Sequence, residues 1–323
     1  GILSTIAASL FPYAQTLTTI SIFLLLTYIG SSCFHPAAAS ILGGLRGHNK
    51  HVAMSIFATF GMAGMSIGQL LFTWTIEYID GQTALLGIMC FLCALALFCM
   101  NLDHPQTTHH QKEISLSLFK KFFGSQPLRS LYFVQLANQT LLWATVFLLP
   151  DLLKGRAYDD WVVFGGGHFF FILGAALSPI PAGFISAKIT PQRTIAISFF
   201  LSMLFLVQIL FLKEMPALLL VTNLFLFGAF LGAVPPLVFS LGNELVPHNR
   251  GMISVFLMGM VWIVSETVGV GGSGIIAGLF TTNGAEYSML LLGIIFSSIG
   301  CIYAYCLHKL QPEELVFVNN APD

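Results

Sequence analysis

The chain has 323 residues, of which 56% are hydrophobic and only 8% are charged, and its formal net charge at pH 7 is −1. Water-soluble domains carry about 25% charged residues, so this composition excludes an ordinary soluble protein and indicates an integral membrane protein. The small net charge says nothing about binding partners. The composition predicts that the protein lies in a lipid bilayer, and we expect it to bind no nucleic acid.

Long apolar runs follow one another along almost the whole chain. All but the first have the roughly 20 residues that cross a hydrocarbon core of about 30 Å as a helix. They lack the alternation of barrel strands, and a backbone in lipid must satisfy its own hydrogen bonds, so helices are expected. In chain order the runs are 2–11, 17–41, 52–76, 84–102, 131–153, 161–186, 194–212, 216–241, 252–280 and 287–308.

Two parts of the chain repeat each other. The stretch HNKHVAMSIF, at 48–57, matches HNRGMISVF, at 248–256, with one residue deleted. Because the matching positions keep one register over two helices and their loop, they predict a parallel repeat and two pseudo-symmetric halves. Further pairs in this register are Pro36 with Pro235, Gly43 with Gly242, and Ser66 with Ser265.

The repeat leaves two apolar runs, 131–153 and 161–186, without partners. We therefore expect the first half to lack about 70 residues upstream, which is two helices and the start of a third. The basic residues gather on the side of the loop at 46–50, so the positive-inside rule places that side in the cytoplasm. The expected domains are an incomplete N-terminal half of four spans at 1–103, a cytoplasmic central loop at 104–130, a six-helix C-terminal half at 131–310 and a cytoplasmic tail at 311–323.

The helix pattern, the central loop and the repeat together resemble the major facilitator superfamily. Within it, GSSCFHPAAAS, followed by AMSIFATFGMAGMSIGQLL and FLLPDLL, resembles the fosmidomycin-resistance family of drug exporters. The loop signature of the superfamily is present only as GFISAKITPQR, with Ala187 and Lys188 where Asp and Arg are usual. The resemblance implies a major facilitator-type helical bundle with about nine and a half of twelve helices present. It also implies a monomeric multi-pass transporter of the bacterial inner membrane.

The resemblance further implies a central cavity lined by runs 17–41, 131–153 and 216–241. Prolines in these runs are expected to act as conformational hinges, because proline weakens a helix. Buried amides also tie helices together in lipid, so a binding role and a structural role both stay open for them. The expected hinges are Pro36, Pro235 and Pro236. The expected substrate-binding residues are Ser31, Ser32, His35, Gln135, Asn138, Gln139, Trp143 and Asn223.

Two titratable residues inside the spans are candidates for proton coupling. The imidazole of His35 has a reference pKa near 6.5, which suits a proton carrier. Alternatively, its ring N–H bonds a carbonyl that Pro36 leaves free. Glu266 departs from the family pattern, whose equivalent region is glycine-rich and uncharged. An ionised carboxylate at that depth is costly, so Glu266 either couples protons or bonds a neighbouring backbone as a neutral acid.

No nucleophile, phosphate-binding loop or metal cluster is evident, so no enzyme activity, metal or cofactor is expected. The expected function is proton-coupled export of small polar or amphipathic compounds by alternating access. A second possibility is an importer of an organic anion or sugar derivative, which would be marked by a Lys or Arg inside the cavity; the spans contain none. A third is a truncated remnant that transports nothing.

Overall fold

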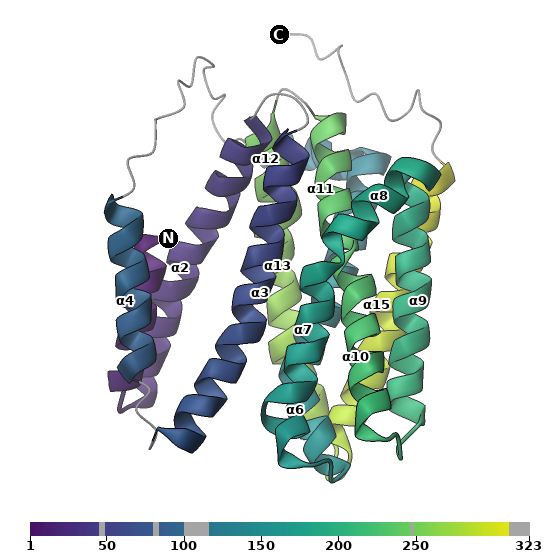
Figure 1. Ribbon diagram of the computed structural model, residues 1–323. Helices are drawn as coiled ribbons and strands as arrows, with labels where there is room; N and C mark the ends of the chain where they lie inside the picture. Colours follow the sequence, from purple (N-terminus) through teal and green to yellow (C-terminus); the bar gives the residue numbers. More distant parts are fainter. Residues whose placement is uncertain (45–48, 80–83, 100–115, 247–248, 310–323) are drawn as a thin grey trace.

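The computed structural model describes residues 1–44, 49–79, 84–99, 116–246 and 249–309. In lipid, an apolar segment satisfies its backbone groups within a helix, and the described part of the chain has helices and turns but no strand (Figure 1). Among the described helices, six are long and apolar enough to cross a membrane, or seven if one bent pair is a single span. The prediction of an all-α membrane bundle is confirmed.

The N-terminal elements follow the predicted apolar runs. Hydropathy marks only the apolar middle of a helix, so α3 extends beyond run 52–76 into polar residues, while α2 continues past run 17–41 to Gly44. The elements are α1 (Ile2–Leu10), the 3₁₀-helix η1 (Phe11–Tyr13), α2 (Leu17–Gly44), α3 (Asn49–Tyr78) and α4 (Ala84–Cys99).

The C-terminal elements include three π-helical turns. Such turns interrupt the regular α-helical register and are frequent at functional sites. The elements are α5 (Leu116–Gly124), α6 (Gln126–Gly155), η2 (Val162–Gly166), α7 (Gly167–Leu177), α8 (Pro179–Ile189), α9 (Pro191–Phe211), α10 (Ala217–Gly232), α11 (Val234–Leu245), α12 (Arg250–Ser254), η3 (Val255–Met260), α13 (Val261–Glu266), η4 (Thr267–Gly272), α14 (Ser273–Gly278) and α15 (Gly284–Lys309).

The central loop predicted at 104–130 is partly helical. Residues 100–115 lie outside the described part of the chain, but α5 and the start of α6 fall within the predicted loop. Ser125 has extended backbone angles and Pro127 follows in the first turn, where its missing N–H costs nothing, so α6 begins at Gln126 rather than at 131. The hydropathy signal missed these turns because α5 is short and carries Lys120 and Lys121, and the first turn of α6 carries Gln126 and Arg129.

The span predicted at 216–241 forms one membrane-length span, Ala217–Leu245, in which Ala233 interrupts the helix between α10 and α11. Pro235 and Pro236 follow at once, and each lacks the N–H that would bond the carbonyl four residues earlier. By contrast, α2 continues through Pro36 as one helix. The break lies beside two of the three predicted hinges, while the hinge roles themselves stay predictions.

The two halves share the same helix pairings. In the N-terminal half α1 packs against both α2 and α4, and in the C-terminal half α9 packs against both α10 and α15. The repeat extends to single residues: Ser66 and Ser265 are both fully buried, and each hydroxyl donates to the carbonyl three residues earlier, at 3.1 Å and 3.3 Å. The predicted pseudo-symmetry is therefore confirmed, with α6 and α7 unmatched among the described N-terminal helices.

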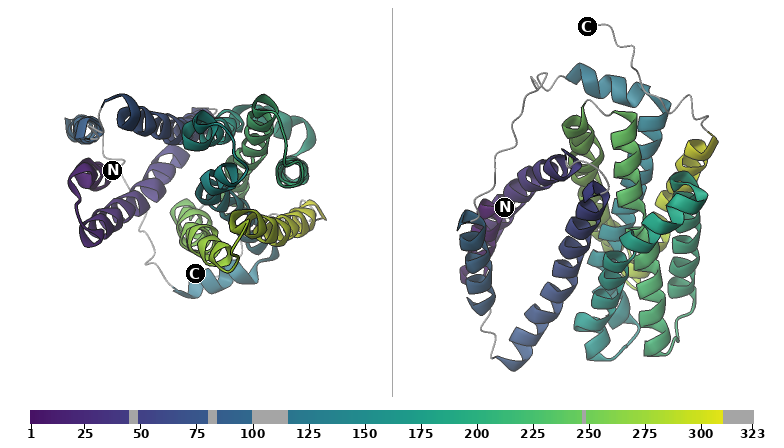
Figure 2. Two further views of the ribbon diagram at one scale, coloured as in Figure 1. Left: turned by 90° about the horizontal axis from the view of Figure 1, so that it is seen from below. Right: turned by 45° about the horizontal axis from the view of Figure 1, so that its top comes forward.

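Two helices of the N-terminal half reach the C-terminal half. α3 lies along α7, and Thr73 Oγ1 donates to the carbonyl of Phe164 in η2 at 2.7 Å. α2 meets α12 and η3 near its C-terminal end, and its N-terminal end diverges from the C-terminal half (Figures 1 and 2). The halves are thus in contact at one end of α2 and apart at the other.

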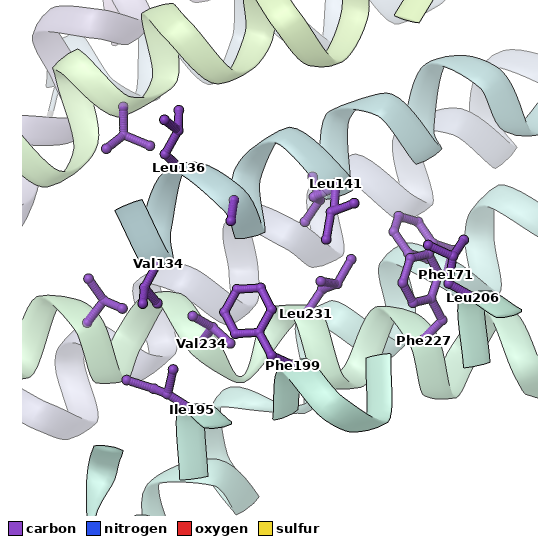
Figure 3. Close-up of a cluster of buried hydrophobic side chains, with 14 of the residues drawn as sticks. Val134, Leu136, Leu141, Phe171, Ile195, Phe199, Leu206, Phe227, Leu231 and Val234 are labelled. Atoms are coloured by element: carbon purple, nitrogen blue, oxygen red, sulfur yellow. The ribbon is translucent and has the colours of Figure 1, made fainter. Parts of the chain in front are cut away.

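The buried apolar core lies in the C-terminal half. Figure 3 shows side chains from α6, α7, α9, α10 and α11 packed together, among them Leu141, Phe171, Phe199 and Phe227. In lipid, close van der Waals packing holds such helices together, and small residues at the contact allow their backbones to approach. The core therefore makes the C-terminal half a well-packed frame for the polar residues of α6.

The two ends of the bundle differ in charge. At the end where α2 stops and α3 starts, which we call the basic end, cations predominate; at the opposite, acidic end, carboxylates predominate. Charged residues at the basic end of the described helices are Lys50, Lys120, Lys121, Arg129, Lys188, Arg193, Glu244, Arg250 and Lys309. Those at the acidic end are Glu77, Asp151, Lys154, Arg156, Asp159, Asp160, Lys213, Glu214 and Glu286.

Candidate substrate and proton site

The amide of Asn138 ties α6 to the break between α10 and α11. Asn138 is fully buried, and its Nδ2 donates to the carbonyl of Leu231 at 2.8 Å. Leu231 lies four residues before Pro235, which has no N–H to offer that carbonyl. Asn138 therefore supplies a donor that the proline cannot. The hydrogen bond of its Nδ2 is therefore structural, whereas the sequence had left both a binding role and a structural role open for this amide.

Three buried amide atoms in the middle of α6 lack hydrogen-bond partners among the described residues. Gln135 is fully buried, and neither its Oε1 nor its Nε2 has a hydrogen-bond partner among the described residues. The Oδ1 of Asn138, about one turn further along α6, is also unpaired. The next residue, Gln139, is buried as well. A buried polar atom without a partner costs about 1–3 kcal/mol, so such a group suits a site that a ligand or water completes.

Trp143 continues the polar line of α6 toward the acidic end. Its indole Nε1 is buried without a hydrogen-bond partner in the described part of the chain. Gly269 of η4 lies against it: a Cβ added to this glycine would be 3.0 Å from the Trp143 Cβ and 2.9 Å from the Thr140 carbonyl. Gly269 thus lets η4 approach α6, and Trp143 is held at that contact.

Asn223 on α10 has one amide atom bonded within its own helix, while its Oδ1 is buried without a partner among the described residues. Its Nδ2 donates to the carbonyl of Leu219 on its own helix at 2.9 Å and lies 3.8 Å from the sulfur of Met215. These contacts are local to α10 and the turn before it. The role of Asn223 in substrate binding stays a prediction.

His35 lies where the two halves meet. Its ring packs edge-on against Trp262 of α13, with centroids 4.8 Å apart, and its Nδ1 lies 2.9 Å from the carbonyl and 3.1 Å from the hydroxyl of Ser31. The bonded carbonyl is therefore that of Ser31, one residue before the one that Pro36 leaves without a donor. The side chains of Ser32 and Pro36 lie outside the described part of the structure.

Glu266 lies one helical turn after Trp262, on the same face of α13. Its carboxylate is partly buried and has no ion pair or hydrogen bond to a described residue. α6, which packs against α13, has no charged residue between Arg129 and Asp151. From α2, the titratable side chain that contacts α13 is His35, through Trp262. Trp262 was missed as a site residue, although its spacing from Glu266 was a signal for it.

A second polar cluster, at the acidic end, joins three C-terminal helices. Arg156 donates to the carbonyls of Ile209 and Leu210 and pairs with Glu286 at 3.3 Å, and Lys213 also pairs with Glu286 at 3.3 Å. Nearby, burial raises the pKa of the Tyr158 hydroxyl above its usual range, so it stays protonated and donates to the Met215 carbonyl at 2.9 Å. The cluster fastens the ends of α6, α9 and α15.

Comparisons with known proteins identify the family. The sequence model of the Major Facilitator Superfamily matches residues 1–270. The chain belongs to this superfamily. Among curated proteins, none matches it in sequence.

Two solved structures share the fold of this superfamily member. One is the major facilitator transporter FucP in the outward conformation, with a TM-score of 0.65, 16% identity and coverage of 94% of this chain and 80% of that one. The other is a bacterial homologue of the human lysosomal transporter Spinster, inward-facing and unoccupied, with a TM-score of 0.62, 16% identity and coverage of 96% and 83%. At this identity the likeness shows the fold alone.

Membership gives the broad function. Proteins of this superfamily are secondary transporters that sit in a lipid bilayer, bind small-molecule substrates and work by alternating access; they are not enzymes. The described chain, with its apolar helices, is therefore a multi-pass membrane transporter.

Proposed function

We propose that this transporter exports small polar or amphipathic compounds in exchange for protons. The observation that carries the proposal is Glu266, a carboxylate inside a span without a described partner. Such a residue is costly in lipid unless it serves a pathway for protons or substrate. The elements packed against α13 bring no cation to it from the middle of a span. Glu266 is thus free to bind and release a proton.

Polar residues of α2 and α6 supply the rest of the proposed site. His35 is hydrogen-bonded to Ser31 and packs on Trp262, at the contact between the halves. It is the second candidate for proton binding. The unpaired amide atoms of Gln135 and Asn138 suit the hydroxyl, carbonyl or phosphonate groups of a polar compound. We retain the other predicted contacts, at Ser32, Gln139, Trp143 and Asn223, as part of the proposal.

Orientation and direction rest on separate arguments. The basic end carries most of the cations of the described helices, so we place it in the cytoplasm of a bacterium, with the chain in the inner membrane as a monomer. Export follows from the resemblance of the segment around His35 to the fosmidomycin-resistance exporters. Protons then enter from the acidic end and leave at the basic end.

The test is accumulation of a polar phosphonate antibiotic by cells that produce the transporter. We expect lower accumulation than in empty cells, and we expect the difference to disappear when an uncoupler removes the proton gradient. Glu266→Gln keeps the size and hydrogen bonding of the side chain but cannot titrate, so it should abolish driven export while retaining exchange of the compound. Glu244→Gln, the same change at an exposed carboxylate of the basic end, is the matched control and should export normally.

Several results would contradict this function. Export that survives the uncoupler unchanged would exclude proton coupling, and a Glu266→Gln variant with the wild-type rate and pH dependence would exclude that residue as the carrier. Increased uptake would favour an importer of an organic anion or sugar derivative. A chain that neither takes up nor exports any tested compound would favour the remnant that does not transport.

A further inference from the structure

The short helix α5 is fixed across the basic end of the bundle by aromatic contacts. Phe122 is 1% exposed, and its ring centroid lies 5.3 Å from that of Phe256 in η3. Phe123 lies 5.0 Å from Phe256 and 4.9 Å from Tyr132 of α6. Figure 2 shows α5 lying crosswise to the helices of the bundle. One side of α5 is therefore held by the protein, and its orientation is set.

The other side of α5 carries exposed cations. Lys120 lies two residues before Phe122, which on a helix is the opposite face, and Lys121 flanks it; both side chains are exposed, and neither has an ion pair with a described residue. Arg129, at the start of α6, is exposed as well, and its guanidinium donates to the carbonyl of Phe123 at 3.3 Å. Three cations thus gather around the end of α5.

No described carboxylate neutralises this group. In the described helices of the basic end the acidic residue is Glu244, which is exposed on α11 and accepts a hydrogen bond from Ser240 at 3.4 Å. Because α5 lies at the level where the spans end, its cations lie near the headgroups of the adjacent leaflet. Cytoplasmic leaflets are rich in anionic lipids, and their negative surface potential attracts basic residues next to a span.

We propose that Lys120, Lys121 and Arg129 form a binding site for the phosphate groups of anionic lipids. Lipid headgroups and soluble anions share the phosphate group. We assign the site to lipid, because a transporter embedded in a bilayer meets lipid there at high local concentration. Lysine reaches a phosphate as a point charge on a flexible stem, while the arginine offers a planar fork of donors. This proposal rests on the cytoplasmic orientation proposed above for the basic end, and it is independent of the compound transported and of proton coupling.

The experiment compares lipid binding to the purified chain in neutral detergent. The probe is phosphatidylglycerol, titrated while bound lipid is counted by native mass spectrometry, with phosphatidylcholine as the uncharged reference. Each lysine near an anionic surface contributes roughly fivefold in affinity, so K120Q/K121Q should weaken phosphatidylglycerol binding by about 25-fold. The matched control is K188Q/R193Q, which removes the same charge from two exposed positions at the basic end but away from α5.

The lipid-binding results decide the proposal. Selective loss of phosphatidylglycerol binding in K120Q/K121Q, with K188Q/R193Q and phosphatidylcholine binding unchanged, supports it. Equal loss in both double variants would show a general charge effect and overturn it, as would equal affinity of the wild type for the two lipids. Competition by inorganic phosphate at the same concentration as the lipid would assign the site to a soluble anion instead. K120R/K121R, which keeps the charge, should bind like the wild type.

Discussion

At the scale of single residues, Asn138 shows how a helix break in lipid is made tolerable. Its amide donates to the Leu231 carbonyl, which Pro235 leaves without its usual donor. Interhelical hydrogen bonds of this kind are worth about 0.6 kcal/mol on average and at most about 1.7 kcal/mol in membranes. Asn138→Leu should therefore destabilise the chain by roughly 0.5–1.5 kcal/mol in reversible unfolding in mixed micelles.

A double-mutant cycle separates this role from general packing. Pro235→Ala restores a backbone N–H to the Leu231 carbonyl, so Asn138→Leu should cost markedly less in that background than in the wild type. Asn223→Leu is the control, because the Asn223 amide bonds a carbonyl of its own helix. If Asn138→Leu lowers the unfolding free energy equally with and without Pro235, the Asn138 amide does not stabilise the chain through the Leu231 carbonyl.

The carboxylate of Glu286 has two cationic partners at the same distance of 3.3 Å, but they differ in burial. The Arg156 side chain is 7% exposed and also holds two carbonyls of α9, while the Lys213 side chain is 59% exposed. Arg156→Gln should cost about 3 kcal/mol of unfolding free energy, because the largely buried Glu286 carboxylate loses the less exposed of its two partners and two α9 carbonyls lose their donor. Lys213→Gln should cost less than about 1 kcal/mol, since water screens that pair. Similar costs in chemical unfolding would mean that burial does not decide the strength of this network.

At the scale of elements, the contact between α7 and α10 depends on glycine. A Cβ added to Gly228 would overlap the carbonyl of Phe171, whereas one added to Gly183 of α8 would meet nothing within 4 Å. Gly228→Ala should therefore cost about 2–3 kcal/mol through overpacking, and Gly183→Ala should cost nothing. Thermal unfolding of the two variants checks this. A Gly228→Ala chain as stable as Gly183→Ala would show that the helices can separate at no cost.

The helical spans could be predicted from sequence, whereas their interruptions could be predicted only in part. Hydropathy located every span of the described chain, since each needs a long apolar run. It missed α5, which is short and carries Lys120 and Lys121, and it gave no sign of η3 and η4. π-helical turns have no compositional signature, because they arise from tertiary packing. Pro235 marked a break, but Pro36 did not, so proline alone does not decide where a span is interrupted.

At the scale of the whole molecule, the repeat was readable because matching residues keep one register, and Ser66 and Ser265 confirm it in their buried hydrogen bonds. The candidate site was less readable. His35 and Glu266 were found as titratable residues in apolar runs. Trp262, which brings α13 to His35, was not: its four-residue spacing from Glu266 was a signal, but its contact with His35 in the other half leaves no local pattern. Contacts between halves need the three-dimensional structure.

The central claim is that protonation of Glu266 changes which end of the bundle is closed. The most direct measurement uses pairs of spin labels, one pair at each end, after replacement of the six cysteines. The acidic-end pair is Leu17 and Leu218, which are 80% and 79% exposed, and the basic-end pair is Ile56 on α3 and Lys188 on α8. On acidification we expect the two distances to change in opposite directions in the wild type and to stay fixed in Glu266→Gln. Distances that ignore pH in the wild type, or that respond to it equally in Glu266→Gln, would contradict the claim.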